Sequence, residues 1–334
     1  MDTDTKKKRK DKNNFKKLIK EIIISDASIY VAKRILISIV TVFAVITVTF
    51  FVMHAVPGGP FQAEKALSAE AEAILKEKYG LDKPIFSQYL TYLSDVIFRF
   101  DFGPSLKQRG RDSLQIIIDG LKISSKLGIS AALIALVTGT VLGSLAAVKK
   151  NSYADRIIMV VTTAFVSMPS FIIGTFLLFV FSLSLGWLPA SAASADGIKG
   201  LILPIITLSL YPTAYITRLT RSSMLDELSQ DYVRTAKAKG ASAISVIFRH
   251  ALKNSLIPTI TYFGPMLAYI VTGSLVVEKI FAVPGIGRDF IGSITNRDYP
   301  LIMATTIVLS ILVVFMNLIS DILYRAVDPR ISLK

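Results

Sequence analysis

Six mostly apolar stretches alternate with polar and charged segments along the chain. A helix needs roughly twenty apolar residues to cross the hydrocarbon core of a bilayer, where its backbone groups must bond to one another. The apolar stretches therefore predict transmembrane α-helices, at 35–56, 127–148, 157–183, 201–216, 256–277 and 301–323. The fourth stretch gives the weakest signal, because it is short and contains Pro204 and Pro212.

Composition agrees with this pattern and narrows the chemistry. Hydrophobic residues make up 52% of the 334 residues, and there is no cysteine. Disulfide bonds, thiolate metal sites and a cysteine nucleophile are therefore excluded. The predicted fold class is an all-α polytopic membrane protein with six transmembrane helices.

The net charge of +14 would suit a nucleic-acid-binding protein until the basic residues are mapped onto the predicted spans. If the N-terminus is cytosolic, the segments on that side hold 24 lysines and arginines, in 1–34, 149–156, 217–255 and after 323. The short outer loops, 184–200 and 278–300, hold one and three. Short cytosolic loops of membrane proteins carry this excess. Both termini are therefore predicted to be cytosolic, and the charge requires no nucleic acid.

Both ends of the chain are predicted to be cytosolic tails. The N-terminal tail, 1–34, contains the run KKKRK at 6–10, which suits a solvated anchor near anionic lipid better than a nuclear signal. The apolar stretch at 35–56 is too long for the core of a cleavable signal peptide, so it is expected to stay as the first span. The C-terminal tail is 324–334.

The largest segment outside the predicted spans is 57–126, which is expected to be extracellular. It contains two stripes of apolar residues at helical spacing, one from Leu67 to Tyr79 and one from Phe86 to Phe100. Two amphipathic helices of this size bury little apolar surface by themselves. They are expected either to lie on the membrane surface and cap the spans or to form a docking surface for an extracellular partner.

Enzyme signatures are nearly absent from the sequence. The two histidines, His54 and His250, are far apart, and neither an H-E-x-x-H zinc motif nor a P-loop occurs. Within the spans, Asp321 precedes Arg325 at the spacing of a local ion pair, and no row of acidic residues suits a proton-coupled carrier. We therefore predict a non-catalytic chain with no metal site and no cofactor of its own. The energy for any transport must come from another protein.

A polar segment between the fourth and fifth spans, 217–255, gives the clearest signal. The sequence of 231–258, DYVRTAKAKGASAISVIFRHALKNSLIP, predicts two short helices separated at Gly240, a residue that adopts the left-handed backbone readily. Ser229 or Asp231 is expected to cap the first helix. The second helix, from Ser242, is expected to place its apolar side chains on one face, namely Ile244, Ile247, Phe248 and Ala251, with Arg249 in the polar remainder.

Small and basic residues near Gly240 predict how a partner protein could bind there. Ala236, Ala238 and Gly240 leave room for the backbone to enter a groove, while Arg234 and the neighbouring lysines set the orientation by charge. The alternative is a plain amphipathic connector at the lipid surface, where basic residues are equally suited.

This segment resembles the EAA coupling loop of permeases from ABC importers. The matching positions are the small residues and glycine of TAKAKG at 235–240 and the entry to the next span at Leu256-Ile257-Pro258. The leading glutamate of that motif is absent, as is usual in the dipeptide/oligopeptide branch, whose form is close to DYVRTAxAKG. Other segments are similar to the same branch: VPGGP at 56–60, YGLDKP at 79–84, QY at 88–89, DFGPS at 101–105, SMPSF at 167–171, VPGIGR at 283–288, NRDYP at 296–300 and DPR at 328–330. In the first of these, Gly59 stands where the branch has an acidic residue in an LPGDP turn.

The resemblance covers about residues 30–331 and implies the type I transmembrane-domain fold of ABC importers. It implies one of two sibling permeases that form a pore, served by two cytosolic ATPases and an extracellular substrate-binding protein. ATP and Mg²⁺ would be bound by the ATPases. The region 127–323 would be a five-helix core, and its loop would couple to an ATPase through Asp231, Tyr232, Arg234, Ala236, Ala238, Gly240, Arg249 and Pro258.

Cargo and location follow from the same resemblance. The expected cargo is a dipeptide or oligopeptide, and the expected location is the cell membrane of a bacterium or archaeon. Similar permeases import nickel chelates, glutathione or oligosaccharides, which stay as alternatives because the binding protein largely selects the cargo. A stand-alone carrier or channel, or a membrane-bound enzyme or scaffold, would need pore-lining charges or a catalytic domain that the sequence lacks.

Overall fold

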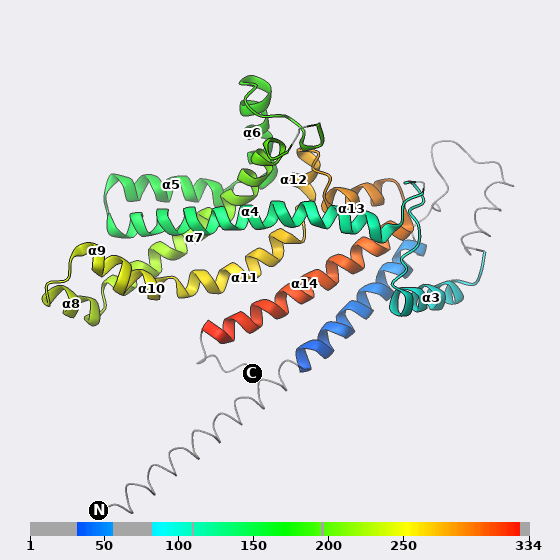
Figure 1. The fold of residues 1–334 in the computed structure, drawn as a ribbon, viewed down its shortest axis with the longest axis horizontal. Helices are drawn as coiled ribbons and strands as arrows, with labels where there is room; N and C mark the ends of the chain where they lie inside the picture. The colour runs from blue at the N-terminus through cyan, green and yellow to red at the C-terminus, as the bar shows by residue number, and fades with distance from the viewer. Residues whose placement is uncertain (1–31, 56–81, 109, 195–196, 328–334) are drawn as a thin grey trace, which may run out of the picture.

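The described part of the chain is almost entirely helical. The computed structural model describes residues 32–55, 82–108, 110–194 and 197–327, and Figure 1 draws the remainder as a grey trace. Within these ranges no strand occurs, and one isolated β-bridge joins Pro104 to Asp112. Five of the described helices are long and apolar enough to cross a membrane, or six if one bent pair is counted as a single span. The all-α class is confirmed.

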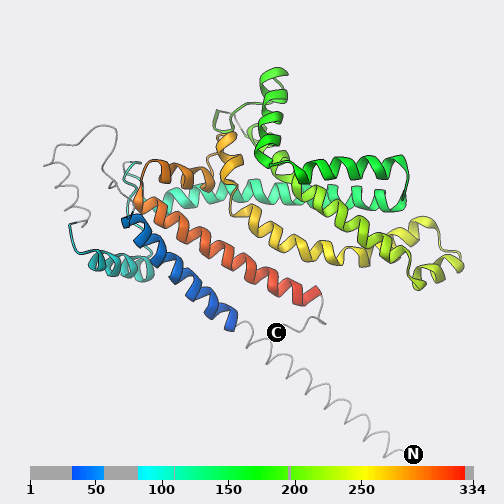
Figure 2. The same cartoon turned by 180° about the vertical axis from the view of Figure 1, so that it is seen from behind.

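Long helices lying side by side form the body of the molecule (Figures 1 and 2). They are the N-terminal helix Ala32–Ala55, α4 Ser113–Val148, α7 Lys199–Leu228, α11 Ile257–Val271 and α14 Tyr299–Val327. The most extensive packing is between α4 and α7, and α11 lies between α4 and α14. A buried cluster from α4, α7 and α11 fills the centre: Ala131, Ala132, Ala135, Ile216, Met266 and Ile270.

Small residues allow α4 and α7 to approach closely. A Cβ atom added to Gly143 would lie 2.6 Å from the carbonyl oxygen of Thr217, and one added to Gly139 would lie 2.7 Å from Ile216. Membrane helices pack mainly through such close backbone approach, because lipid is as apolar as their side chains. The glycines of α4 therefore fix where α7 crosses it.

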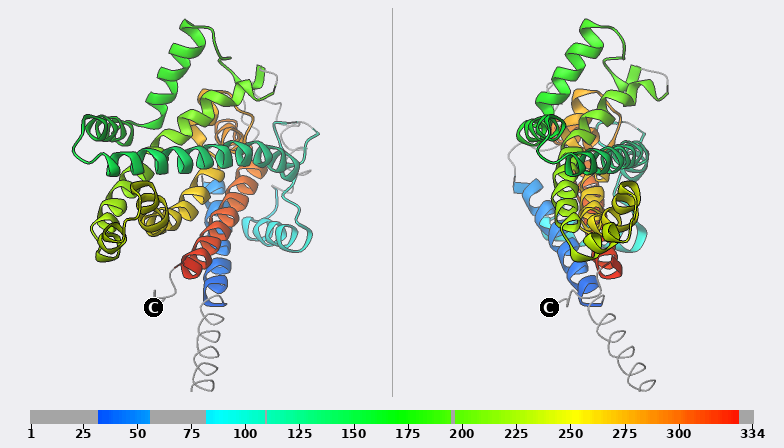
Figure 3. Two further views of the ribbon diagram at one scale, coloured as in Figure 1. Left: turned by 60° about the vertical axis from the view of Figure 1, so that its left-hand side comes forward. Right: turned by 90° about the vertical axis from the view of Figure 1, so that its left-hand side faces the viewer.

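The stretch predicted as one continuous span at 157–183 is bent in the structure. It consists of α5 Tyr153–Ser167, α6 Ser170–Leu177 and the π-helix η2 Leu178–Ser184, with an angle of 107° at the break. Pro169 has no backbone N–H, and a proline disfavours helical backbone at the residue before it. Met168 accordingly adopts an extended conformation with φ −90° and ψ 131°. Figure 3 shows α6 projecting away from the direction of α5.

Three other helix ends differ from the predicted spans. α4 begins at Ser113, ahead of the predicted start at 127, and α7 continues through Pro204 and Pro212 to Leu228, beyond the predicted end at 216. α11 ends at Val271 and is followed by the separate α12, Leu275–Ile280, where a span to 277 was predicted. Hydropathy detects the apolar part of a helix, whereas a helix extends wherever its backbone hydrogen bonds continue.

Short helices gather at the two ends of the long ones. At one end, the connection from α7 to α11 contains α8 Asp231–Ala238, α9 Ala243–Ser245, η4 Val246–Ala251 and α10 Leu252–Ser255 (Figure 1). At the other end lie α12, α13 Ile286–Thr295, η3 Ala192–Ser194, and the amphipathic α3 Ile85–Ser94 with its π-helical extension η1 Asp95–Arg99. The apolar stripe from Leu67 to Tyr79 lies outside the described residues.

Candidate functional site

The segment between α7 and α11 forms a compact helical corner, which we call the α8–α10 corner (residues 231–255). The predicted cap of its first helix is wrong. Gln230 occupies the N-cap position of α8, and neither Ser229 nor Asp231 makes a side-chain capping bond there. Asp231 instead lies in the first turn, where its negative charge suits the positive end of the helix dipole.

The turn after α8 requires glycine because of its backbone conformation. Gly240 has φ +82°, as predicted from the sequence. The N–H of Gly240 donates to the carbonyl of Lys237 (3.0 Å) and that of Ala241 to the carbonyl of Ala236 (3.1 Å). This pair of bonds is the Schellman arrangement that ends many helices. No atom lies within 4 Å of the position of an added Cβ, so conformation rather than space requires the glycine.

The second helix of the corner begins as predicted, but its apolar residues do not share one face. The Ser242 hydroxyl accepts a bond from the N–H of Ser245 (3.3 Å) and caps the helix. Val246 and Ala251, five residues apart, are buried, whereas Ile244 and Phe248 are 70% and 65% exposed. The π-helix η4 explains the difference, since its wider turn changes which residues align.

Tyr232 and Val233 anchor the corner to the end of α7. The Tyr232 hydroxyl donates to the carboxylate of Glu227 and accepts from the side-chain amide of Asn254 (3.1 Å). Burial and the bond to Glu227 raise the pKa of the Tyr232 phenol above its ordinary value. Val233 is fully buried. Tyr232 thus joins α8 to both α7 and α10.

The exposed surface of the corner has small or apolar residues at its centre and basic residues around them. Ala238, Gly240, Ile244 and Phe248 are exposed, while Ala236 is partly buried. Exposed basic side chains surround them: Arg234, Lys237, Lys239, Arg249 and Lys253. An apolar patch with a charged rim is typical of a protein-binding surface. Pro258 lies apart from this surface, in the first turn of α11.

A partly buried ion pair joins α5 to α7 near this corner. The Asp155 carboxylate accepts from Nε of Arg221 (2.6 Å) and from Nη2 of the same residue (2.8 Å), and it also accepts from the N–H of Asn151 (2.9 Å). The two side chains are 4% and 23% exposed. Such two-point geometry holds the α4–α5 hairpin on the helix that leads into α8.

At the opposite end of the molecule, a fully buried carboxylate holds α12 against α13. Glu278 accepts from the hydroxyl of Ser124 (2.7 Å) and from the N–H of Gly287 (2.8 Å). The Ser124 oxygen in turn accepts from the N–H of Ile286 (3.0 Å). A Cβ on Gly285 would lie 2.5 Å from this carboxylate. The glycines of VPGIGR therefore make room for a carboxylate at the N-terminus of α13, where the helix dipole favours negative charge.

A second buried carboxylate joins two motifs that lie far apart in sequence. Asp298, just before α14, accepts from the hydroxyl of Ser105 and from the N–H of Leu106 (3.0 Å). Asp298 is 1% exposed and Ser105 is 5% exposed. The segments DFGPS and NRDYP thus meet at the same end of the molecule as Glu278 (Figure 1).

Comparison with known proteins places the chain in a family. Residues 139–333 match the family described as binding-protein-dependent transport system inner membrane component, and residues 28–108 match the N-terminal domain of the same components. The chain is 41% identical over 304 residues to the dipeptide transport system permease protein DppB of Bacillus subtilis (strain 168), covering 91% of this chain and 98% of that protein. It is 40% identical over 302 residues to the oligopeptide transport system permease protein OppB of Salmonella typhimurium, covering 90% and 98%.

The chain is a permease of this family. The fold agrees with that membership. The structure titled "Inward facing conformations of the MetNI methionine ABC transporter" matches 64% of this chain and 97% of its own chain with a TM-score of 0.52, at 18% sequence identity. The type I transmembrane-domain fold of ABC importers is therefore confirmed. As a member of this family, the permease is a non-catalytic, multi-pass membrane subunit.

The buried carboxylates of the permease were missed by sequence reasoning. Glu278 directly follows the predicted end of the fifth span, and Asp298 lies in a predicted loop, so neither was counted as an acidic residue within a span. A sequence signal was present for Glu278, because a glycine-flanked helix start follows it at GIG. His54, to which the sequence assigns no role, is half-buried, with its ring nitrogens bonded to the carbonyl of Phe50 (2.8 Å) and the side chain of Gln88 (3.1 Å).

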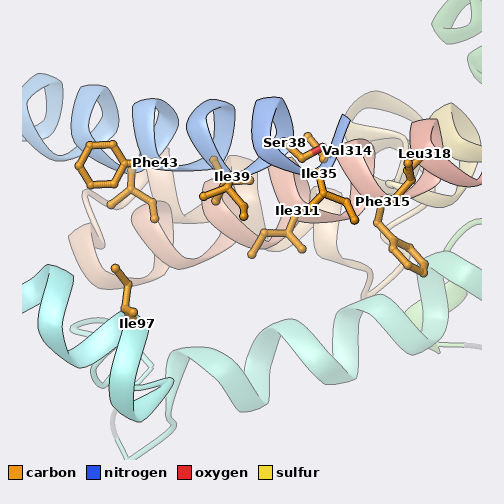
Figure 4. A pocket seen from close by; sticks show the side chains of 11 residues that line it. Ile35, Ser38, Ile39, Phe43, Ile97, Ile311, Val314, Phe315 and Leu318 are labelled. Atoms are coloured by element: carbon orange, nitrogen blue, oxygen red, sulfur yellow. The ribbon is translucent and has the colours of Figure 1, made fainter. Parts of the chain in front are cut away.

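The permease also has an apolar pocket between its N-terminal helix and α14 (Figure 4). Its volume is about 480 Å³, and nearly all of its lining is aliphatic or aromatic. The one polar side chain there, Ser38, already donates to the carbonyl of Arg34 (2.7 Å). Such a pocket suits a lipid chain and offers nothing to a charged, water-soluble cargo.

The Asp155–Arg221 pair is expected to contribute strongly to the stability of the permease. Asp155→Asn should lower the free energy of unfolding by about 3 kcal/mol, because it leaves a partly buried arginine without its counter-charge. Unfolding in detergent, followed by fluorescence, measures the change. Asp231→Asn is the matched control, since its pair with Arg234 is exposed and 3.6 Å long and should contribute little. If Asp155→Asn and Arg221→Gln lower stability additively in the double variant, the two residues do not interact as described.

Proposed function

We propose that this permease forms, with a sibling permease, the membrane pathway of an ATP-driven importer of dipeptides or oligopeptides. The observation that carries the proposal is the identity of 41% to a dipeptide permease, extending over 91% of this chain. Identity of this extent covers both ends of the molecule, including the α8–α10 corner and the buried carboxylates. Two cytosolic ATPases and an extracellular peptide-binding protein complete the proposed machine.

The α8–α10 corner is proposed as the surface that an ATPase contacts. Its exposed centre at Ala238, Gly240 and Phe248 would enter a groove, and Arg234 and Arg249 would orient it by charge. ATP and Mg²⁺ are bound and used by the ATPases, not by this chain. Because Tyr232 bonds to both Glu227 and Asn254, displacement of the corner moves the ends of α7 and α10 with it.

Continuous helices support transmission of that displacement. α7 is a single helix of 30 residues that runs from the α8–α10 corner to the end where α12 and α6 lie. The Asp155–Arg221 pair makes α5 follow α7. A movement at the corner would therefore change the spacing of helices at the far end, which is the requirement for alternating access.

Topology and location are part of the same proposal. The corner and both termini would be cytosolic, and the end with α3, α12 and α13 would face outward and receive the binding protein. The distribution of basic residues supports this orientation. The membrane would be the cell membrane of a bacterium or archaeon.

Purification from native membranes tests the proposal. The tagged permease should co-purify with P-loop ATPases, a second six-span protein and a binding protein, and the reconstituted complex should take up tritiated dialanine or penta-alanine only with ATP. Uptake of a nickel chelate, glutathione or an oligosaccharide in place of peptide would keep the machine and change the cargo. A permease that purifies alone and moves solute without ATP would overturn the proposal in favour of a carrier.

A further inference from the structure

Four tyrosines lie on α7 and α11, and we call them together the tyrosine face: Tyr211, Tyr215, Tyr262 and Tyr269. The rings of Tyr215 and Tyr262 stack with their centroids 4.2 Å apart. Tyr211 lies one helical turn from Tyr215, and Tyr269 lies two turns from Tyr262, so each pair shares one side of its helix. Tyr211, Tyr215 and Tyr269 are 45%, 40% and 83% exposed.

The hydroxyls of the tyrosine face lack hydrogen-bond partners. None of the four makes a hydrogen bond to another group in the part of the chain that the structure describes. Tyrosines in membrane proteins usually lie at the lipid–water interfaces, where water and headgroups bond to the hydroxyl. Tyr211 and Tyr215, however, lie near the middle of the candidate span Lys199–Leu228, and hydrocarbon offers no partner at that depth.

Other exposed helix faces of the permease differ from this one. Most exposed residues in the middle of α4 are aliphatic, as at Ile134, Val137 and Val141, and those of α5 include Val160 and Val161. The hydroxyl of Thr138, which is also exposed, donates to the carbonyl of Ile134 in its own helix (2.6 Å). The aliphatic side chains are suited to contact with lipid tails. The tyrosine face is therefore the exception that needs an occupant able to form hydrogen bonds.

The face continues along α7 with polar residues. Arg218, Ser222 and Asp226 follow Tyr215 at intervals of three or four residues and are all exposed. Arg218 has no ion pair or hydrogen bond among residues 32–55, 82–108, 110–194 and 197–327. Arg218 lies on α7 just beyond the predicted end of the fourth span at 216, where the helix leads toward the α8–α10 corner. Its exposed guanidinium can therefore donate to a polar ligand at that end of the face.

We propose that the tyrosine face and Arg218 form one wall of the path along which cargo moves and contact the peptide directly. Tyrosine hydroxyls both donate and accept, so they match the amide groups of any peptide backbone regardless of sequence. Arg218 supplies a planar cation for the carboxylate at the end of the peptide. This inference rests on the proposed function, because it assumes that peptides are the cargo.

A contact with the sibling permease is the competing occupant of this face. Helix pairs in membranes associate mainly through small residues that allow close backbone approach. The tyrosine face instead presents four large rings, four unbonded hydroxyls and an arginine. A mobile, hydrated ligand with amides and a carboxylate matches that chemistry better than a packed helix does.

Photo-cross-linking in the complete importer distinguishes these occupants. Tyr269→p-benzoyl-phenylalanine places a reactive group on the face, and Val160→p-benzoyl-phenylalanine, at a residue 69% exposed on α5, is the matched control. With ATP, binding protein and tritiated penta-alanine, label should be transferred to the permease from position 269 and not from 160. Cross-links from 269 only to the sibling permease or only to lipid would overturn the proposal. Peptide import by the complex modified at 160 would support the proposed importer and its peptide cargo. Absence of peptide cross-linking from position 269 would then count against the tyrosine face alone.

A second experiment tests Arg218 by its charge. The ratio of KM for a peptide amide to KM for the free acid should be at least about tenfold smaller in Arg218→Gln than in the unaltered importer, since only the acid can use the arginine. Carboxylate selection by the binding protein affects both importers equally and cancels in this comparison. Arg156→Gln, a change at an exposed arginine of α5, should leave the ratio unchanged. Equal ratios in the unaltered importer and Arg218→Gln would show that Arg218 does not bind the carboxylate.

Discussion

Gly240→Val is expected to abolish most ATP-driven uptake while leaving the permease folded and in the membrane. Valine at φ +82° is strained by about 1–2 kcal/mol, and the strain is relieved by unwinding the turn that joins α8 to α9. Because no neighbouring atom lies within 4 Å, the added side chain disturbs no internal packing. It would, however, occupy the centre of the surface proposed to enter an ATPase.

The measurement is uptake and peptide-stimulated ATP hydrolysis by the reconstituted complex, with uptake falling by about tenfold or more if one such contact is lost. Gly186→Val is the matched control, since Gly186 also has positive φ and open space around it but lies at the other end of the molecule, just after η2. Normal uptake by Gly240→Val, with ATPase still coupled, would show that this turn is not the contact surface.

The second large effect is expected from Glu278→Ala, which should prevent stable assembly of the end formed by α12 and α13. Removal of the carboxylate leaves the hydroxyl of Ser124 and the N–H groups of Gly287 and Arg288 without their acceptor in a fully buried site. The free energy of unfolding should fall by about 3 kcal/mol or more, because each unsatisfied buried group costs about 1–3 kcal/mol.

Yield of folded permease and its unfolding midpoint in detergent measure this effect. Lys279→Ala, at the exposed neighbouring residue, should change neither. Glu278→Gln keeps the shape of the side chain and one acceptor oxygen. Its unfolding midpoint should therefore lie between those of Glu278→Ala and the unaltered permease. An unfolding midpoint for Glu278→Ala equal to that of the unaltered permease would show that the hydrogen bonds around Glu278 do not stabilise it.

Local sequence patterns predicted part of the corner. The left-handed conformation of Gly240 and the start of the second helix near Ser242 depend on residues within a few positions, so they are visible in the sequence. The face of the second helix was wrong because helical spacing assumes ordinary turns, whereas η4 inserts wider ones. The bend at Pro169 was missed because hydropathy records how apolar a segment is and ignores its direction.

Contacts between distant segments could not be predicted in this way. Ser105 and Asp298 are separated by 193 residues, and Ser124 and Glu278 by 154. Their motifs were recognised one by one from resemblance to a family, but no periodicity shows which motif meets which. Burial also changes the role of an acidic side chain, because the carboxylates of Glu278 and Asp298 accept hydrogen bonds from backbone N–H groups. Only the packed arrangement of helices reveals that role.

The bond between Asp298 and the segment after Ser105 also sets an order for biosynthesis. Asp298 lies at the start of the last helix, so it leaves the ribosome long after Ser105 and the intervening helices. Until then, the N–H of Leu106 lacks the acceptor that it has in the finished protein. The segment after Ser105 therefore acquires its final shape only when translation is nearly over. A chain truncated before Asp298 would leave that segment without its anchor.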